Sequence, residues 1–536
     1  MGEGFDREAS KLPGPIRIER RGLMPGGRVY LVGAGPGDPE LLTLRGAAIL
    51  KQADVVIYDA LVSPRLLDLC PTGAERIFVG KRRGHQEMPQ EEINRLLVDN
   101  ARRGRCVVRL KGGDPYIFGR GAEEAEALAS EGLEFRVVPG VTAGIGAAAY
   151  SGIPITHRDY ASAALFVTGH DDPDSPQCRV DWPMLARFCG TIAIYMGVTR
   201  LVRIAQVLLA HGKAGETPVA LVREGTLPGQ EVRVMTLAEV ALHKANTLLI
   251  QPPALVLIGE VVNVRNKLDW FSRLPLAGMT FVIARAESDA AAMVQPLEGL
   301  GARVLSAPAI RVGPIAGKGP LDTAMRTLER FDWLVFTSGN GVRYFIERLF
   351  ELGFDLRALG RLKIAAIGPA TAARLRDVGL VADLVPEKFR SEELAEALSR
   401  EVGGKRVLLA RADRGRTLLR DELESVASEV VQVPVYTNAD AEKLPDDVIN
   451  EIQDAKVDWV MLTSSAMARR FAALLPADLS PECRQKMKFA SISPVTTGAA
   501  RESGIEITVE ATEFTIAGLI DAVIAFRKEQ KEVSGN

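Results

Sequence analysis

The sequence predicts an α/β protein made of two consecutive regions, each built from buried strands that alternate with helices. Three observations carry this prediction. Short runs rich in Val and Ile recur between helical stretches from residue 28 onwards. Glycine-rich loops follow two of the early strands, at the junctions where open α/β sheets bind ligands. Finally, the second region repeats its own motifs at an almost constant spacing.

The first region begins with five short apolar segments, which we interpret as the strands of a largely parallel sheet. They are residues 29–32, 55–58, 76–79, 107–110 and 135–138. Helical stretches such as 40–52, 90–103 and 122–131 separate them. A second strand set follows at 191–196, 218–223, 231–235 and 254–258, with a hairpin connection at 225–229. We therefore expect two α/β subdomains with a ligand-binding cleft between them.

Two loops of the first region are the strongest indication of a ligand. Residues 33–38 read GAGPGD and residues 111–121 read KGGDPYIFGRG. Glycine allows positive φ and close approach of the backbone to a ligand, and Asp38 and Asp114 add fixed charges. A dinucleotide fingerprint is excluded at 33–38 because its third glycine is replaced by Asp38, and Pro36 lacks an N–H group. The loops predict a site for another small polar molecule, with a ligand-free turn as the alternative.

These loops, together with blocks at 56–59, 79–82, 139–143, 152–158, 195–197 and 218–222, resemble the signatures of the uroporphyrinogen-III C-methyltransferases. The resemblance covers residues 28–270. It implies the two-subdomain fold of tetrapyrrole (class III) methyltransferases. It also implies S-adenosylmethionine (SAM) as methyl donor, and two methyl transfers to C2 and C7 of uroporphyrinogen III, giving precorrin-2. This chemistry requires neither a metal nor a covalent intermediate.

The resemblance also assigns candidate site residues. Those implied to line the SAM site are Pro36, Gly112, Gly113, Asp114, Ile117, Thr142, Ala143, Met196 and Gly225. Asp59 and Lys81 follow predicted strands, and the family proposes them as proton acceptor and proton donor. Their structural alternatives are a turn cap for Asp59 and a carboxylate anchor for Lys81, and Met196 has the alternative of a core residue.

The implied substrate carries eight carboxylates, so positive side chains beside the loops are candidates to bind it. The residues that we select for this role are Arg82, Arg109 and Lys111. The alternative is that these charges only solvate the surface.

Residues 263–278 form a junction, with a linker at 271–278, after which the second region repeats itself. The segment DWLVFTS at 332–338 returns as DWVMLTS at 458–464, 126 residues later, and the ARA at 284–286 returns at 410–412 with the same spacing. IGPAT at 367–371 returns as ISPVT at 492–496, 125 residues later. The repeats predict a duplicated, two-lobed domain with Ser and Thr at its strand ends, where helix capping is the alternative explanation for the hydroxyls.

This second region resembles the uroporphyrinogen-III synthases from residue 279 to about 528, through segments at 336–342, 366–372, 433–436 and 492–497. The resemblance implies two interleaved lobes, one from 279–310 plus 436–528 and the other from 311–435. It implies closure of hydroxymethylbilane to uroporphyrinogen III without a cofactor. Tyr436 is our candidate for assisting loss of the hydroxyl group, with a hinge residue as the alternative. The candidates for binding acetate and propionate groups are Thr337, Ser338, Thr371, Ser464 and Thr496.

Composition limits the remaining possibilities. The formal net charge of −2 gives no electrostatic case for nucleic acid, and the five cysteines form no zinc-type pair. No apolar run is long enough for a membrane span. We expect a flexible leader at 1–27, a tail at 529–536, no metal, small-molecule tetrapyrroles as partners, a cytoplasmic location, and a homodimer formed through the methyltransferase region.

The sequence therefore predicts a bifunctional enzyme that makes uroporphyrinogen III and methylates it. The alternative is a methyltransferase of a later corrin precursor fused to a non-catalytic tetrapyrrole-binding module.

Overall fold

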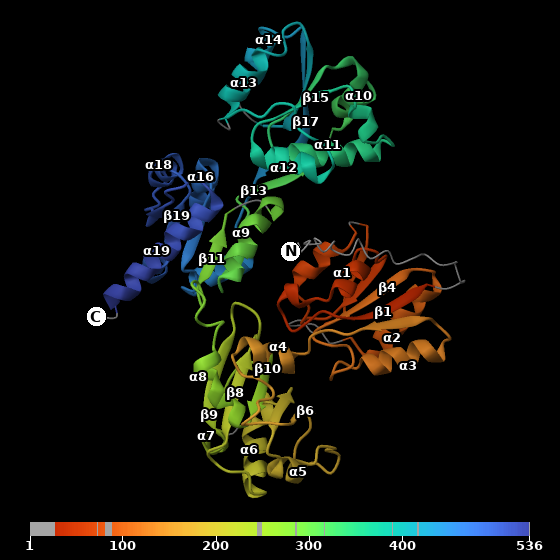
Figure 1. Ribbon diagram of the computed structural model, residues 1–536, viewed down its shortest axis with the longest axis vertical. Helices are drawn as coiled ribbons and strands as arrows, with labels where there is room; N and C mark the ends of the chain where they lie inside the picture. The colour runs from red at the N-terminus through yellow and green to blue at the C-terminus, as the bar shows by residue number, and fades with distance from the viewer. Residues whose placement is uncertain are drawn as a thin grey trace, which may run out of the picture. The chain divides into compact units, whose positions relative to one another are not determined.

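The structure is a computed structural model that describes residues 27–71, 73–80, 88–243, 249–284, 287–315, 317–387, 390–414 and 417–534. The predicted leader, except Gly27, lies outside these residues. The chain divides into two compact units, Met1–Gly278 and Met279–Asn536, and each contains two five-stranded sheets (Figure 1). Helices pack against all four sheets, so the predicted α/β class is confirmed.

The first sheet of the N-terminal unit is wholly parallel, with strand order β3-β2-β4-β1-β5. Its strands are β1 (Arg28–Gly33), β2 (Val55–Tyr58), β3 (Glu75–Phe78), β4 (Cys106–Lys111) and β5 (Phe135–Val138). The helices around it are α1 (Leu44–Leu50), α2 (Gln90–Arg102) and α3 (Gly121–Ser130), with 3-10 turns at Pro39–Leu41 and Pro64–Leu69.

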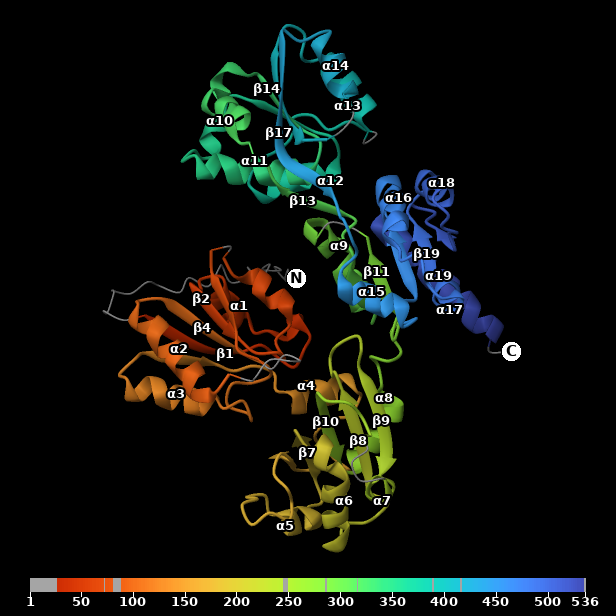
Figure 2. The same ribbon diagram turned by 180° about the vertical axis from the view of Figure 1, so that it is seen from behind.

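Alternation along β1 explains why helices cover both faces of this sheet. Tyr30 and Val32 belong to the core that includes Leu50 of α1. Val29 and Leu31 point the other way, into the core that α2 and α3 close. The two layers of helices are visible on opposite faces of the sheet in Figure 2. Because the strands are buried on both sides, their sequences are almost continuously apolar.

The second sheet of this unit is mixed, with strand order β6-β7-β10-β8-β9. Its strands are β6 (Ala164–Thr168), β7 (Thr191–Tyr195), β8 (Pro218–Arg223), β9 (Glu231–Thr236) and β10 (Ala254–Ile258). Its helices are α5 (Trp182–Arg187), α6 (Leu201–Ala210), α7 (Leu237–Leu242) and α8 (Arg265–Leu268), with 3-10 turns at Val198–Arg200 and Glu260–Val264. The β8 and β9 strands pair antiparallel, which confirms the predicted hairpin.

Helix α4 (Ala143–Tyr150) joins the two sheets of the N-terminal unit. It begins directly after the loop that follows β5, at the edge of the first sheet where the parallel strands end. Its Ala147 and Ala148 are buried in the core of the second sheet, with Ala193 of β7 and Leu257 of β10. Small side chains let this helix lie close to the strands, so α4 fixes the two sheets around the candidate site.

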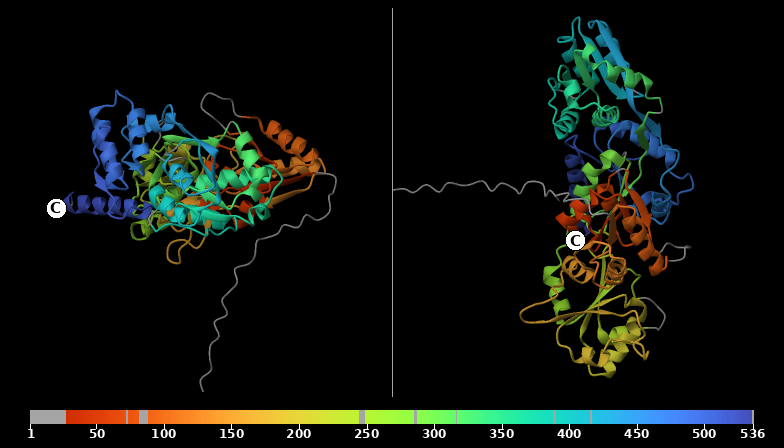
Figure 3. Two further views of the ribbon diagram at one scale, coloured as in Figure 1. Left: turned by 90° about the horizontal axis from the view of Figure 1, so that it is seen from above. Right: turned by 90° about the vertical axis from the view of Figure 1, so that its right-hand side faces the viewer.

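The C-terminal unit contains a parallel sheet of order β12-β11-β18-β19-β20. Its strands are β11 (Thr280–Ile283), β12 (Arg303–Ser306), β18 (Trp459–Leu462), β19 (Lys488–Ser491) and β20 (Val509–Glu510). Its helices are α9 (Glu287–Gly299), α15 (Asp446–Gln453), α16 (Ser465–Leu474), α17 (Pro481–Lys486), α18 (Pro494–Glu502) and α19 (Ile516–Ser534). Helix α19 leads to the C-terminal end of the chain (Figure 3).

The other sheet of this unit has strand order β13-β17-β16-β14-β15. Its strands are β13 (Ile310–Pro314), β14 (Trp333–Phe336), β15 (Lys363–Ala366), β16 (Arg406–Ala412) and the long β17 (Glu429–Asp440). Its helices are α10 (Gly319–Arg326), α11 (Gly339–Glu351), α12 (Pro369–Asp377), α13 (Ser391–Ser399) and α14 (Leu418–Glu424), with 3-10 turns at Leu328–Arg330 and Leu356–Leu359.

The repeats seen in the sequence are exchanged between these two sheets. Strands β11, β12, β14 and β15 return as β16, β17, β18 and β19, with starting residues 126, 126, 126 and 125 positions later. Each sheet therefore takes its first strands from one repeat and its later strands from the other. Strand β13 pairs antiparallel with the end of β17, where Val312 faces Asn438, its own equivalent in the second repeat. A local two-fold axis thus passes through this pair.

Candidate functional site

The two glycine-rich loops of the N-terminal unit lie side by side at the ends of β1 and β4. Gly113 donates to the carbonyl oxygen of Gly35 at 2.7 Å, and Gly35 donates back to Gly113 at 3.2 Å. At Gly33, a Cβ atom would come within 2.6 Å of both Gly113 and Gly140, so backbone crossing alone requires that glycine. At Gly113, with φ of +70°, the nearest described atom would be 3.8 Å away. The position that a side chain of residue 113 would occupy is therefore open, and its absence leaves space beside the loop.

Unusual backbone conformations gather around these loops. Among the described residues, six non-glycine residues have positive φ, and five of them are Phe118, Arg120, Met196, Glu224 and Thr226. They lie in the loop after β4 and in the loops after β7 and β8, so both sheets contribute. Such conformations cost about 1–3 kcal/mol each and gather at ligand sites. Their grouping supports a ligand at this place more directly than the glycines do.

A polar network joins the first glycine-rich loop to the second sheet. The hydroxyl of Tyr150 donates to Asp38 at 2.8 Å, and the amide of Asp38 donates to the hydroxyl of Thr226 at 3.0 Å. Gln230 completes the network through the amide of Thr226 and the carbonyl of Tyr150. Burial and the Asp38 carboxylate raise the pKa of Tyr150. The network holds the loops after β1 and β8 in one arrangement.

A second network fixes the start of α4. The Tyr195 hydroxyl lies 2.8 Å from the hydroxyl of Thr142 and accepts from the amide of Gly144 at 2.6 Å. Burial raises the pKa of Tyr195. Asp114 accepts from the amides of Tyr116, at 2.8 Å, and Gly140, at 3.0 Å. The Asp114 carboxylate therefore shapes its own loop, because each of its oxygens accepts a backbone amide.

The candidate SAM residues come together from both sheets. A Cβ at Gly146 would meet Pro36 at 2.5 Å, a Cβ at Gly225 would meet Ala147 at 2.3 Å, and Gly113 faces Thr142. Met196 is 50% exposed, which contradicts the alternative of a core residue. The nine residues of this set are Pro36, Gly112, Gly113, Asp114, Ile117, Thr142, Ala143, Met196 and Gly225, all in the loops after β1, β4, β5, β7 and β8 or at the start of α4.

Asp59 follows β2 at the same edge of the first sheet. One carboxylate oxygen accepts from the amide of Leu61 at 3.2 Å, as the turn-cap alternative predicts. The other lies 3.7 Å from Nη1 of Arg109, and the side chain is 26% exposed. Asp59 is thus anchored on one side and accessible on the other. Lys81 and Arg82 lie outside the described residues.

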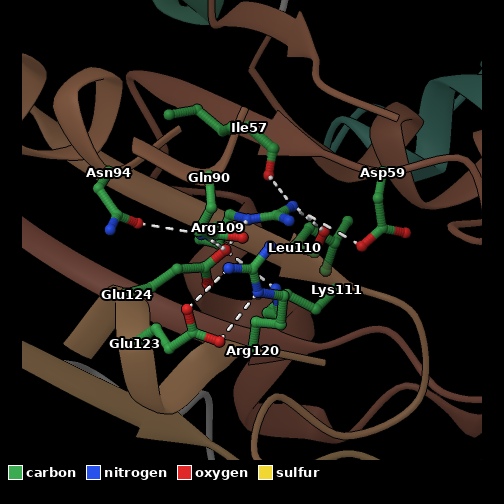
Figure 4. A network of polar contacts seen from close by, with 10 residues as sticks. All are labelled: Ile57, Asp59, Gln90, Asn94, Arg109, Leu110, Lys111, Arg120, Glu123 and Glu124. Carbon is green, nitrogen blue, oxygen red and sulfur yellow. Dashed lines mark hydrogen bonds and ion pairs between the residues drawn. The ribbon is translucent and has the colours of Figure 1, made fainter. Parts of the chain in front are cut away.

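Two of the cations that the sequence predicts to bind the substrate are buried and do not face an open site. Arg109 and Lys111 are each only 3% exposed, and both donate to Oε1 of Glu124, at 2.9 and 3.0 Å (Figure 4). Burial and the nearby Arg109 lower the pKa of Lys111, while Glu124 opposes this shift. In this structure the two cations serve an internal carboxylate. The sequence places Arg109 and Lys111 beside a loop, but it does not show that Glu124 on the following helix is their buried partner.

In the C-terminal unit, Tyr436 lies within β17, beside α11. Its hydroxyl lies 2.9 Å from the hydroxyl of Ser338, and its ring stacks on Tyr344 at 5.8 Å between centroids. The guanidinium of Arg343 lies 4.4 Å from the Tyr344 ring. Tyr436 is 6% exposed. The structure therefore brings Tyr436 and Ser338 together, as two hydroxyls of one hydrogen-bonded pair.

Among the hydroxyl candidates, the two serines cap helices and two of the threonines are buried. Ser338 caps α11 through the amide of Gly341 at 3.0 Å, and Ser464 caps α16 through Met467 at 3.3 Å. Thr371 and Thr496 lie in the first turns of α12 and α18 and are 4% and 2% exposed. Thr337 directly precedes Ser338 and is half-buried. Capping explains the two serines, and contact of Thr371 or Thr496 with a ligand would require these side chains to become exposed.

Sequence reasoning missed four residues that build the N-terminal site. Tyr150, Tyr195 and Thr226 join the loops by hydrogen bonds, and Glu124 pairs with the buried cations. Tyr195 and Thr226 directly precede or follow predicted site residues, so proximity in the sequence was an available signal. Tyr150 and Glu124 gave no such signal, because their partners are 112 and 15 residues distant.

The described residues hold no group of three or more His, Cys, Asp or Glu arranged to bind a metal ion. Within the same residues, no helix is both long and apolar enough to cross a membrane.

Comparison with known families matches the two units in succession. The model of the tetrapyrrole (corrin/porphyrin) methylases matches residues 28–241, and that of the uroporphyrinogen-III synthase HemD matches residues 291–521. A crystal structure of uroporphyrin-III C-methyl transferase from Thermus thermophilus, complexed with S-adenyl homocysteine, is 43% identical. It covers 44% of this chain and 94% of its own, with a TM-score of 0.38.

Curated relatives differ in how much of this chain they match. Siroheme synthase 1 of Yersinia enterocolitica is 55% identical over 251 residues, which cover 46% of this chain and 52% of that protein. The chain thus spans about half the length of the siroheme synthases that it matches. The porphyrin biosynthesis protein HemD of Ruminiclostridium josui is 35% identical over 502 residues, covering 94% of this chain and 98% of that protein. Both resemblances are therefore confirmed: the chain belongs to the family of this HemD protein, and it joins a tetrapyrrole methylase region to a uroporphyrinogen-III synthase region.

Proposed function

We propose that this chain catalyses two consecutive reactions of tetrapyrrole synthesis. The C-terminal unit closes hydroxymethylbilane to uroporphyrinogen III. The N-terminal unit then transfers two methyl groups from SAM to C2 and C7 of that ring, which gives precorrin-2. The observation that carries the proposal is the succession of a methylase region and a synthase region in one chain, because one region makes the substrate of the other.

The residues of the N-terminal site fit SAM. Gly113 leaves open space beside its loop, and Ile117 and the half-exposed Met196 offer apolar surface for the adenine and thioether parts of the ligand. When bound, SAM supplies a sulfonium methyl group for transfer. The residues proposed to hold it are Pro36, Gly112, Gly113, Asp114, Ile117, Thr142, Ala143, Met196 and Gly225.

The reacting pyrrole carbon is already electron-rich, so the main task of the protein is to orient the ring. It must also take up the proton that leaves the ring after methylation. We assign this role to Asp59, whose carboxylate is held by Leu61 and Arg109 and remains 26% exposed. Lys81 as proton donor and Arg82 as a substrate-binding residue stay proposals from the sequence alone.

In the C-terminal unit, Tyr436 is proposed to donate a hydrogen bond to the hydroxyl group that leaves hydroxymethylbilane. Its pairing with Ser338 supports this role, because the pair fixes the direction of the phenol. Thr337, Ser338 and Ser464 are proposed to contact acetate or propionate groups near the starts of α11 and α16. Thr371 and Thr496 stay sequence predictions for that role.

Two assays with separate substrates test the proposal under anaerobic conditions. Supplied uroporphyrinogen III and SAM should yield a dimethylated product by mass spectrometry, and supplied hydroxymethylbilane alone should yield isomer III. Methylation of a later precorrin but not of uroporphyrinogen III would favour the alternative methyltransferase. Formation of isomer I alone would make the C-terminal unit a binding module.

The assembly and the cellular location are also proposals. The family resemblance suggests a homodimer through the N-terminal unit and a cytoplasmic protein. Light scattering should give twice the mass of the full chain for the full chain, and twice the mass of the fragment for residues 1–278. A monomer of the full chain would contradict the proposed dimer.

A further inference from the structure

Three charged side chains are enclosed below the loop at 111–121. Arg109 and Lys111 come from β4 and Glu124 comes from α3, with exposed fractions of 3%, 3% and 0%. Figure 4 shows Oε1 of Glu124 directed at both cations. Gln90 of α2 also approaches this oxygen, at 3.4 Å. Glu124 therefore joins its own helix α3 to β4 and α2 at one buried point.

The charges of this cluster balance only when Asp59 is included. Two cations face the single buried carboxylate of Glu124, and the carboxylate of Asp59 lies 3.7 Å from Arg109. The neighbouring charges Arg120 and Glu123 pair with each other at 2.8 Å. Burying an unbalanced charge is costly, and the Asp59 carboxylate completes the charge balance of the cluster at its exposed end.

Stability alone does not explain why three charged side chains are buried here together. Buried ion pairs are often no more stable than apolar residues of similar size. The other oxygen of Glu124, Oε2, is buried and has no hydrogen-bond partner among the described residues, which adds a further cost. Because burial of the Glu124 carboxylate carries these costs, we looked for a contribution of Glu124 to the site.

The geometry around Arg109 indicates that role. Its Nε donates to Glu124 at 2.9 Å, while Nη1 faces the carbonyls of Leu110, at 3.2 Å, and Ile57, at 3.4 Å, and the carboxylate of Asp59. A planar guanidinium held at Nε has its Nη1 atom fixed in direction. We propose that Glu124 is a positioning residue for the methyl transfer, which orients Arg109 and through it the carboxylate of Asp59. This inference rests on the proposed methyltransferase function.

A pair of double variants of the full chain separates positioning from stability. Both carry Lys111→Met, so that one cation and one carboxylate are removed together and the remaining charges balance. Glu124→Gln in this background keeps an oxygen that accepts from Arg109, whereas Glu124→Leu removes it. We expect the Leu variant to have a kcat for methylation at least about tenfold below that of the Gln variant, because small misplacements are costly in catalysis. The KM for SAM and the melting temperature should match in the two variants. Equal kcat values would overturn the proposal.

Arg109→Lys serves if the Leu variant does not fold. It keeps the charge but loses the fixed direction of the guanidinium, so kcat should fall at least about tenfold with little change in the KM for SAM. An unchanged kcat in this variant would overturn the proposal as well. Glu131→Gln, on the exposed end of the same helix, is the matched control and should behave as the unmodified chain. If the unmodified chain itself does not methylate, the proposed function fails and this inference with it. If it does and the two double variants are equal, only the inference fails.

Discussion

Small and polar residues follow the strands of both the N-terminal and the C-terminal unit, but they have different structural roles in the two units. In the N-terminal unit, loops at strand ends carry positive φ values at Phe118, Met196 and Thr226 and leave open space beside Gly113. In the C-terminal unit, the hydroxyls at strand ends cap helices or lie buried, as at Ser464 and Thr496. A motif that costs conformational energy indicates a ligand, whereas a motif that satisfies the backbone is already explained by the fold.

The largest expected effect concerns the proton acceptor of the N-terminal unit. Asp59→Asn should lower kcat for methylation about 10²–10⁴-fold, the usual range for loss of a general base. Isomer III formation by the same preparation should stay unchanged, and this is the internal control. Initial rates of both reactions measure the effect. A methylation rate within about threefold of the unmodified chain would leave Asp59 with only its turn-capping role.

Tyr436→Phe is the converse test in the C-terminal unit, because it should slow isomer III formation and leave methylation unchanged. Loss of the phenol removes a hydrogen-bond donor, and the rate of isomer III formation should fall about tenfold or more. Methylation of supplied uroporphyrinogen III should not change. The two isomers can be separated chromatographically after oxidation to porphyrins. If the rate is retained, Tyr436 is a packing residue beside Tyr344.

Two glycine substitutions in the paired loops separate an effect on stability from an effect on SAM binding. Gly33→Ala places a Cβ within 2.6 Å of backbone atoms and should destabilise the unit by several kcal/mol, about the cost of overpacking with backbone shifts. Gly113→Ala meets only the strain of positive φ, about 1–2 kcal/mol, and should mainly weaken SAM binding. Thermal unfolding and calorimetric titration with SAM distinguish the two. Equal losses of stability would contradict the open space beside Gly113.

The threonines of the C-terminal unit should give smaller effects. Thr371→Val and Thr496→Val keep the buried shape and should change stability by about 1 kcal/mol, with the KM for hydroxymethylbilane unaltered. Steady-state kinetics and thermal unfolding measure both quantities. An increase of KM with unchanged stability would instead support the role predicted from the sequence.

The smallest effect is a pH dependence in the N-terminal unit. The pKa of Tyr150 is raised by burial and by Asp38, so its contribution to stability is complete below the pKa of the unfolded chain. That contribution is lost as the pH rises through the folded pKa, because the unfolded chain releases its proton first. The loss of melting temperature between neutral and strongly alkaline pH should be smaller in Tyr150→Phe. An identical loss in both proteins would contradict this assignment.

Local signals in the sequence predicted the fold and the position of the two glycine-rich loops after β1 and β4. Apolar strands, the Gly225 hairpin region and the spacing of 126 residues specified all four sheets in outline, because these features depend on neighbouring residues. The exchange of repeats between sheets was expected only from the family resemblance, which implies interleaved lobes, since spacing alone does not say which strands pair. The partners of Arg109 and Lys111 were also missed, because Glu124 is recognisable only once α3 packs against β4.

The central claim is that one chain performs both reactions, and a one-pot anaerobic assay tests it most directly. The intact protein is given hydroxymethylbilane and SAM, and the product is followed by mass and absorbance. The account predicts a product two methyl groups heavier than uroporphyrinogen III. Unmethylated isomer III, or methylation only when uroporphyrinogen III is supplied, would contradict it.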